Sequence, residues 1–376
     1  MSESKLFCDQ VQPQVLDIHP YIPGKPISEV KRELGLTTIT KLASNENPLG
    51  ASPLALQAIQ DELVDIARYP DGGAYSLKTA LAKFIGVASH NIAIGNGSNE
   101  VLELVARVFA SEGDEVIYSQ YAFAVYPIST QIVGATGVEV TARNWGHDLS
   151  AMLAAITKKT KLIYIANPNN PTGTFFSKAE WDAFISKVPK NVVVVLDEAY
   201  LEYAASLMPS ELHFNGVDYI ADYENLLVSR TFSKAYGLAA LRIGYIVGHA
   251  DLISYINQVR EPFNVNQLAQ VAAIKALEDQ AFVANSIKIN QLGLKQVKTA
   301  IEELGISYIP SAGNFICIDL GSKAMQINQA LLQKGVIVRP VANYGMDGYL
   351  RISIGTQIEN DHFIDALKEI IKSRAH

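Results

Sequence analysis

Polar residues that could form a ligand site follow four short apolar runs of the sequence. The polar segments, each with the run before it, are 96–99 after 92–94, 167–173 after 161–166, 197–200 after 192–196, and 230–234 after 226–229. Gly95-Asn96-Gly97-Ser98 could form a nest of backbone amides at a helix N-terminus, which holds a phosphate without any net basic charge. The same four residues could equally form a turn and a helix cap.

Asp197 and Lys234 bring a carboxylate and an amine to two of these segments. Asp197 could simply cap the helix that follows it, and Lys234 could lie at the surface or pair with Asp197. The loop Asn170-Pro171-Thr172-Gly173 consists of residues that favour turns. No segment specifies a function by itself, so the question is whether the fold brings them together.

Short β-branched runs alternate with amphipathic stretches through the middle of the chain. The expected strands are 91–94, 115–118, 161–166, 192–196 and 225–229, and the expected helices include 98–110, 150–157 and 178–186. This alternation predicts an α/β fold, with a sheet of mostly parallel strands and helices on both faces. The unbroken apolar run 192–196 is typical of a strand buried on both faces. Because ligands bind beyond the carboxyl ends of such strands, we expect the four polar segments to meet at one edge.

The pattern differs at the two ends of the chain. Prolines 13, 20, 23 and 26 predict an irregular N-terminal arm over residues 1–44, followed by a large domain over 45–265. A long helical region from 266 to about 304 then precedes further short strands and helices. We expect residues 266–376 to form a smaller α+β domain, joined by part of the N-terminal segment.

Composition narrows the class of protein. The 376 residues include 38 acidic and 31 basic ones, a net charge of −7 that gives no general attraction to nucleic acid or an anionic membrane. The longest apolar stretches have six residues, too few to span a bilayer, and the N-terminus lacks the apolar run of a signal peptide. Two cysteines, without a CxxC or HxxxH pattern, favour a reducing compartment and no metal site. We therefore expect a cytoplasmic enzyme.

The order and approximate spacing of seven residues resemble those of the fold-type-I pyridoxal-phosphate aminotransferases. These residues are Asn170, Asp197, Tyr200, Thr231, Ser233, Lys234 and Arg242. The segments that carry the resemblance span nearly the whole chain and are 69–70, 95–100, 170–173, 197–200, 231–244 and 349–356. The resemblance implies pyridoxal 5'-phosphate as cofactor, bound by the large domain of a two-domain α/β fold.

The resemblance also assigns the chemistry to particular residues. Lys234 would bind the cofactor aldehyde covalently and then move the proton from the substrate's Cα. Asp197 would keep the pyridine nitrogen protonated, so that the ring can accept electrons. Tyr200 and Asn170 would hydrogen-bond the ring's phenolic oxygen. The further cofactor-binding residues that it implies are Gly97, Ser98, Asn99, Thr231, Ser233 and Arg242 around the phosphate, and Phe123 over the ring, with plain core packing as the alternative for Phe123.

Within the family the sequence is most similar to the histidinol-phosphate aminotransferases, through segments 18–26, 42–48, 68–71, 335–340 and 349–353. The implied reaction moves the amino group of L-histidinol phosphate to 2-oxoglutarate, giving imidazole acetol phosphate and glutamate in histidine biosynthesis. Arg351 and Arg339 would bind the substrates' anionic groups, since a guanidinium binds carboxylate and phosphate alike. Tyr21 would close the site, and Tyr69 would reach the site of the neighbouring subunit in a homodimer. Aromatic aminotransferases and phosphothreonine-decarboxylase-like lyases share much of the pattern and are the alternatives.

Overall fold

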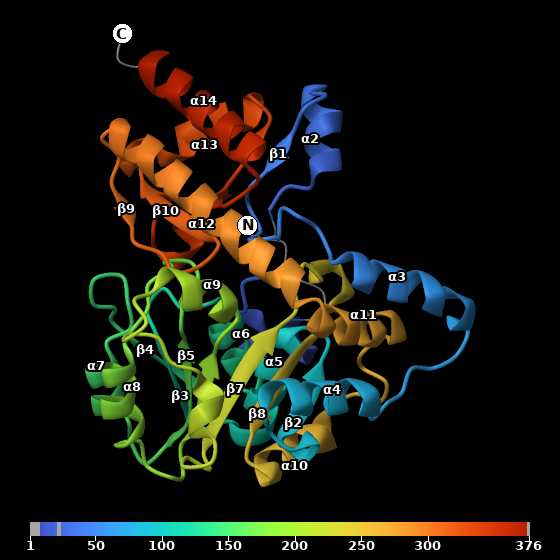
Figure 1. Cartoon of the computed structure of the whole chain (residues 1–376). Helices are drawn as coiled ribbons and strands as arrows, with labels where there is room; N and C mark the ends of the chain where they lie inside the picture. Colours follow the sequence, from blue (N-terminus) through green and yellow to red (C-terminus); the bar gives the residue numbers. More distant parts are fainter. Residues whose placement is uncertain (1–7, 21–23, 374–376) are drawn as a thin grey trace.

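The protein has two bodies that a long helix connects (Figure 1). The computed structural model describes residues 8–20 and 24–373. The larger body is built on a seven-stranded sheet and the smaller one on a four-stranded sheet, and α12 (Gln280–Glu303) runs from one to the other. Over the described ranges, no helix is long and apolar enough to cross a membrane.

The seven-stranded sheet is mostly parallel, as the sequence pattern predicts. Its strands are β2 (Ile92–Gly95), β3 (Glu115–Ser119), β4 (Thr136–Val140), β5 (Thr160–Ala166), β6 (Val193–Asp197), β7 (Leu226–Thr231) and β8 (Gly244–Gly248). Their order is β2-β8-β7-β6-β5-β3-β4, and β8 alone runs antiparallel to its two neighbours. The five strands expected from the sequence are present within two residues of their expected ends, whereas β4 and β8 were not expected.

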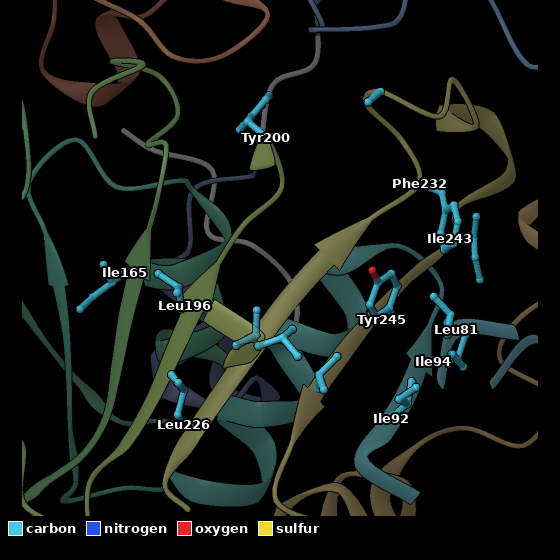
Figure 2. Close-up of a cluster of buried hydrophobic side chains, with 14 of the residues drawn as sticks. Leu81, Ile92, Ile94, Ile165, Leu196, Tyr200, Leu226, Phe232, Ile243 and Tyr245 are labelled. Atoms are coloured by element: carbon cyan, nitrogen blue, oxygen red, sulfur yellow. The ribbon is translucent and has the colours of Figure 1, made fainter. Parts of the chain in front are cut away.

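Both faces of this sheet are buried, which explains the continuous apolar runs. Val194 and Leu196 of β6 pack into the core on one face, and Val193 and Val195 pack into the core on the other. Figure 2 shows part of the first core, with Leu196 beside β6 and Tyr200 beyond the end of that strand. Because successive side chains of a strand point to opposite faces, a strand between two helical layers must be apolar throughout.

Helices cover the two faces in separate groups. Those that contribute to the first core are α3 (Pro53–Glu62), α4 (Tyr75–Ile85), α7 (Leu149–Ala154), α8 (Lys178–Ile185), α9 (Leu201–Leu207) and α11 (Gln267–Glu278). Those of the opposite face are α5 (Ser98–Phe109), α6 (Val125–Ile132) and α10 (Ala250–Val259). The sheet therefore lies between two helical layers, and its carboxyl-end edge remains free for a site.

The smaller body has an antiparallel sheet under three helices. Its sheet order is β12-β13-β10-β9, with the strands β9 (Tyr308–Ile309), β10 (Phe315–Asp319), β12 (Arg339–Pro340) and β13 (Tyr349–Ser353). The helices that share its core are α12, α13 (Ala324–Gln333) and α14 (Gln357–Ser373). Arg339 and Arg351 lie directly opposite each other on β12 and β13, so both guanidinium groups come from one small patch of sheet.

The prediction of an irregular N-terminal arm is wrong for part of that segment. Residues Pro13–Leu16 form the short α1, and Ile27–Leu34 form the eight-residue α2, with Pro26 as its N-cap and Gly35 in the left-handed conformation at its end. Proline is tolerated at a helix start because the first amides have no intrahelical acceptor, so Pro26 marks a helix boundary instead of an irregular loop. The following β1 (Thr40–Lys41) pairs with β11 (Val336–Ile337).

The division of the chain into domains at residues 45 and 266 stays a prediction. Leu42, from the N-terminal segment, packs in the smaller core. Helix α11 packs in the larger core, and α12 contributes Val283 to the larger core and Leu294 to the smaller one. The middle of a continuous helix therefore forms one connection between the two bodies, and the segment between Leu42 and α3 forms another.

Candidate active site

The four polar segments meet in one cavity at the carboxyl ends of β2, β5, β6 and β7. The cavity has a volume of about 310 Å³. Its polar lining from the larger body comprises Ser98, Asn99, Tyr126, Asn170, Asp197, Tyr200, Thr231, Ser233, Lys234 and Arg242. Ser44 and Asn45 line it from the N-terminal segment and Arg351 from the smaller body. The expectation that the strand ends deliver their polar groups to one edge is confirmed.

Asp197, the last residue of β6, is 5% exposed and has only part of its hydrogen-bonding capacity used. Its Oδ2 accepts a hydrogen bond of 2.8 Å from the Tyr126 hydroxyl, while its Oδ1 has no partner among the described residues. Burial raises the pKa of Asp197 to about 6, against the opposing effect of the Tyr126 hydrogen bond. A buried carboxylate oxygen without a partner is unusual and indicates room for a donor supplied by a ligand.

Lys234 lies just beyond β7 with its amine inside the cavity. Its Nζ is 3.3 Å from the carbonyl oxygen of Ser44 and 5.7 Å from the centre of the Tyr200 ring. Burial, followed by the positive charge of Arg351, lowers the pKa of Lys234 to about 8. A substantial fraction of these amines is therefore neutral at slightly alkaline pH, as nucleophilic attack or proton uptake requires.

Tyr200 is held by a residue of the N-terminal segment. Its hydroxyl accepts a hydrogen bond of 3.0 Å from Asn45 Nδ2, and Asn45 in turn exchanges hydrogen bonds with Ser353 of β13. Burial raises the pKa of Tyr200 to about 12. The hydroxyl therefore keeps its proton at neutral pH and can donate it into the cavity.

One end of the cavity is suited to an anion. Helix α5 begins at Ser98, and its first backbone amides have no acceptor within the helix. Gly97 precedes it with φ 86°, and a Cβ at this position would collide with the guanidinium of Arg242. Arg242 donates to Ser233 Oγ (3.4 Å) and to the carbonyl of Ala239 (3.1 Å). The backbone conformation favours glycine here, and the missing side chain lets the guanidinium of Arg242 lie against this segment.

Arg351 reaches the cavity from β13 and is 5% exposed. It donates to Asn170 Oδ1 and, at 2.9 Å, to the carbonyl of Ala43, while its Nε has no partner among the described residues. Its guanidinium also lies over the Phe315 ring, 5.4 Å from the centroid. Arg339 is buried but borders a neighbouring cavity of about 820 Å³, so the structure does not bring it into the first cavity.

The remaining expected residues lie in different surroundings. Phe123 lines the cavity and packs edge-on against Tyr126, with 6.0 Å between ring centres. Tyr69 is 83% exposed, is stacked on Phe263 and does not line the cavity of its own chain. Tyr21 lies outside the described residues.

Sequence reasoning missed two side chains that hold the expected ones, Tyr126 and Asn45. Tyr126 follows Phe123 by three residues within the apolar stretch 121–126, and a buried tyrosine usually needs a partner for its hydroxyl. That need is the signal that could have singled it out. Asn45 belongs to the segment 42–48, but nothing in its local pattern indicates that it contacts Tyr200.

The fold and this site define a class of protein. The family model for "Aminotransferase class I and II" matches residues 37–367, and the chain belongs to this family.

Among individual proteins, the chain is 62% identical over 374 residues to a histidinol-phosphate aminotransferase of Hydrogenovibrio crunogenus, covering 99% of each chain. It is 54% identical over 367 residues to one of Pseudomonas fluorescens, covering 97% of this chain and 98% of the other. The crystal structure of histidinol-phosphate aminotransferase from Sinorhizobium meliloti, in complex with pyridoxal-5'-phosphate, superposes with a TM-score of 0.88 at 29% identity and covers 99% of each chain.

Proposed function

We propose that this chain is a pyridoxal-phosphate-dependent aminotransferase that moves the amino group of L-histidinol phosphate to 2-oxoglutarate, giving imidazole acetol phosphate and glutamate in histidine biosynthesis. The observation that carries the proposal is one cavity lined by Lys234, Asp197 and Arg351, in a chain 62% identical over its full length to a histidinol-phosphate aminotransferase.

The hydrogen-bonding groups that line the cavity fit those of pyridoxal phosphate. The buried Oδ1 of Asp197 has no partner among the described residues, and a protonated ring nitrogen would supply one. The start of α5 with Gly97, Ser98 and Arg242 suits the phosphate, because backbone amides and a guanidinium fork both bind phosphate oxygens. When bound, the cofactor supplies an aldehyde that reacts with amines and a ring that accepts the electrons left when a Cα proton departs.

Lys234 is the residue that we assign to covalent attachment and proton transfer. Its lowered pKa, about 8, leaves enough neutral amine to take up a proton and enough basicity to return it. Tyr200, which keeps its proton, and Asn170 would orient the ring through its phenolic oxygen. Asp197 would pair with the protonated ring nitrogen, since it is the acidic residue among the described residues that line the cavity.

Arg351 is the proposed anchor for the anionic group of each substrate. Its buried Nε, which no other described residue engages, is a donor available to a ligand, and Asn170 and Ala43 hold the guanidinium in place. Arg339, opposite Arg351 on the neighbouring strand, is proposed as the second phosphate-binding arginine. Because Arg339 borders the adjoining cavity, it would act on the distal end of a long substrate.

We propose that the enzyme is a homodimer in which Tyr69 reaches the partner's site. In support, Tyr69 is exposed and does not line the cavity of its own chain, and the same segment exposes Val64, Ile66 and Tyr75. Exposed apolar side chains in a group are typical of an interface. Mixing inactive Lys234→Ala subunits with Tyr69→Ala subunits should restore activity, because a mixed dimer contains one site with both residues intact.

A cytoplasmic location is also proposed, supported by the low cysteine content and by Cys317, which is a buried free thiol. The decisive experiment on function is a panel of amino donors with 2-oxoglutarate as acceptor: histidinol phosphate, phenylalanine, tyrosine and phosphothreonine. We expect the highest kcat/KM for histidinol phosphate and glutamate as a product. A preference for phenylalanine would replace the proposal by an aromatic aminotransferase, and release of carbon dioxide from phosphothreonine would replace it by a lyase.

A further inference from the structure

The two oxygens of Asp197 are in different situations, and Tyr126 causes the difference. Oδ2 accepts the Tyr126 hydroxyl at 2.8 Å, whereas Oδ1 is buried without a partner among the described residues. Tyr126 and Asp197 both line the cavity. A carboxylate held through one oxygen cannot turn freely about its bond to the chain, so the free oxygen keeps one direction.

Tyr126 itself is rigidly placed. It is fully buried in the first turn of α6, and its ring is stacked on Tyr164 with 4.8 Å between centres and 5° between planes. Tyr164 is anchored by its own hydroxyl, which donates to the carbonyl of Leu102 at 2.7 Å. The Tyr126 hydroxyl therefore offers Asp197 a donor at a fixed point and not a mobile one.

We propose that Tyr126 is a positioning residue, which holds the Asp197 carboxylate ionised and presents its Oδ1 to the protonated ring nitrogen of the cofactor. The inference rests on the proposed function, because it needs a cofactor with such a nitrogen. Burial favours the neutral form of Asp197 and the Tyr126 hydrogen bond opposes it. Tyr126 would thus act on the ring through Asp197, without contributing to the binding of the phosphate at the other end.

The test compares two ligands of the apoenzyme, pyridoxal phosphate and its 1-deaza analogue, in which a C–H replaces the ring nitrogen. The ratio of their dissociation constants measures what the nitrogen contributes, and it requires no turnover. We expect wild-type protein to prefer pyridoxal phosphate. In Tyr126→Phe, which keeps the ring stack, this preference should fall by about tenfold, the effect of one hydrogen bond to a charged group.

Tyr164→Phe is the matched control, since it removes a buried hydroxyl from the same ring stack without touching Asp197. It should leave the preference unchanged even where it lowers the melting temperature. In Asp197→Asn the preference should already be lost, and adding Tyr126→Phe should change it no further.

An unchanged preference in Tyr126→Phe, or an equal loss in Tyr164→Phe, would show that Tyr126 only fills the core, and would leave the proposed function intact. A wild-type protein that binds both ligands equally would instead overturn the role of Asp197 and, with it, that of Tyr126. The panel of amino donors tests the reaction separately.

Discussion

Two consecutive carboxylates at the end of β6 have opposite surroundings. Glu198 is 2% exposed and fully engaged: its Oε2 accepts from Arg230 Nε and Nη2 at 3.0 and 2.6 Å, and its Oε1 accepts from the amide of Gly216 at 2.7 Å. Arg230 also donates to Asn215 Oδ1 at 2.6 Å. Within the described part of the chain, Asp197 has one side-chain partner, on Oδ2, and its buried Oδ1 has none.

The difference follows from the alternation of side chains along an extended chain, which sends neighbouring residues to opposite faces. The Glu198 side chain is fully used by Arg230 and by the backbone amide of Gly216, so neither of its oxygens remains for a ligand. Asp197 meets the cavity. A satisfied buried charge is therefore the mark of a structural role here, and an incompletely satisfied one is the mark of a binding role.

The largest expected effect is on catalysis, and it follows from removing the amine in the cavity. Lys234→Ala should abolish transamination, because the amine is both the covalent anchor and the proton carrier. The fold should persist, since removing a buried amine with a lowered pKa takes away an unfavourable burial. Turnover and thermal unfolding, measured on the same preparation, check the loss of activity and the persistence of the fold. Multiple turnovers without an added amine would contradict the assignment.

The structural carboxylate, Glu198, is tested through its partner Arg230, and here the expected effect is on stability. Arg230→Leu would leave Glu198 charged, buried and without its main partner, and we expect the free energy of unfolding to fall by about 3–5 kcal/mol. Denaturant titration measures this loss. Arg107→Leu, which removes an exposed i,i+4 pair with Glu103, is the control and should cost less than about 1 kcal/mol. Equal losses in the two variants would remove the distinction drawn above.

Asp197→Asn should change stability and activity in opposite directions at neutral pH. The folded-state pKa is raised from 3.8 to about 6, so the folded protein binds this proton more tightly than the unfolded chain does. That stabilisation is complete below pH 4 and is lost as the pH rises through 6, a change of up to about 3 kcal/mol at about 1.4 kcal/mol per pKa unit.

The Asn variant cannot ionise, so its apoenzyme should be more stable than wild type at pH 7 and similar to it at pH 4. Its turnover should nevertheless fall far more than its affinity for the cofactor, because the phosphate contacts remain while the ring nitrogen loses its anion. Unfolding curves at the two pH values and a cofactor titration check this. Near-normal turnover would show that Asp197 is placed wrongly.

Arg351→Lys should have a smaller effect, which still falls on both substrates. The lysine keeps the charge but loses the planar fork and the bonds to Asn170 and Ala43. Losing one charge-assisted hydrogen bond corresponds to roughly a ten- to hundredfold lower kcat/KM. The measurement is kcat/KM for histidinol phosphate and for glutamate. A variant in which neither donor is affected would refute a shared anchor.

The smallest expected effect is a change of preference. Arg339→Ala should lower kcat/KM for histidinol phosphate more than for phenylalanine, provided that Arg339 binds the second negative charge of the phosphate. Initial rates with both donors give the ratio. A uniform loss would place Arg339 among the residues that only support β12 and β13, since it lies opposite Arg351 in that pair of strands.

The sequence by itself determined the α/β class and the edge at which the site lies. Local periodicity was enough, because strands buried on both faces are continuously apolar and the polar segments begin where those runs end, as at Asp197 and Asn96. The family resemblance also selected most of the polar residues that line the cavity. The antiparallel β8 was not predicted, and its pairing with β2 joins residues far apart in the chain, such as Ile92 and Val247.

Only the tertiary structure decided which side chains support the site. Tyr126 meets Asp197 across 71 residues, Asn45 meets Tyr200 across 155, and Arg351 meets Asn170 across 181. These contacts join helix to strand, N-terminal segment to strand end, and one body to the other, and no local pattern encodes such pairs. The tertiary structure also decided the different hydrogen-bond partners of Asp197 and Glu198. Two neighbouring acids look alike in the sequence, and only the partners that the fold places around each one distinguish the binding carboxylate from the structural one.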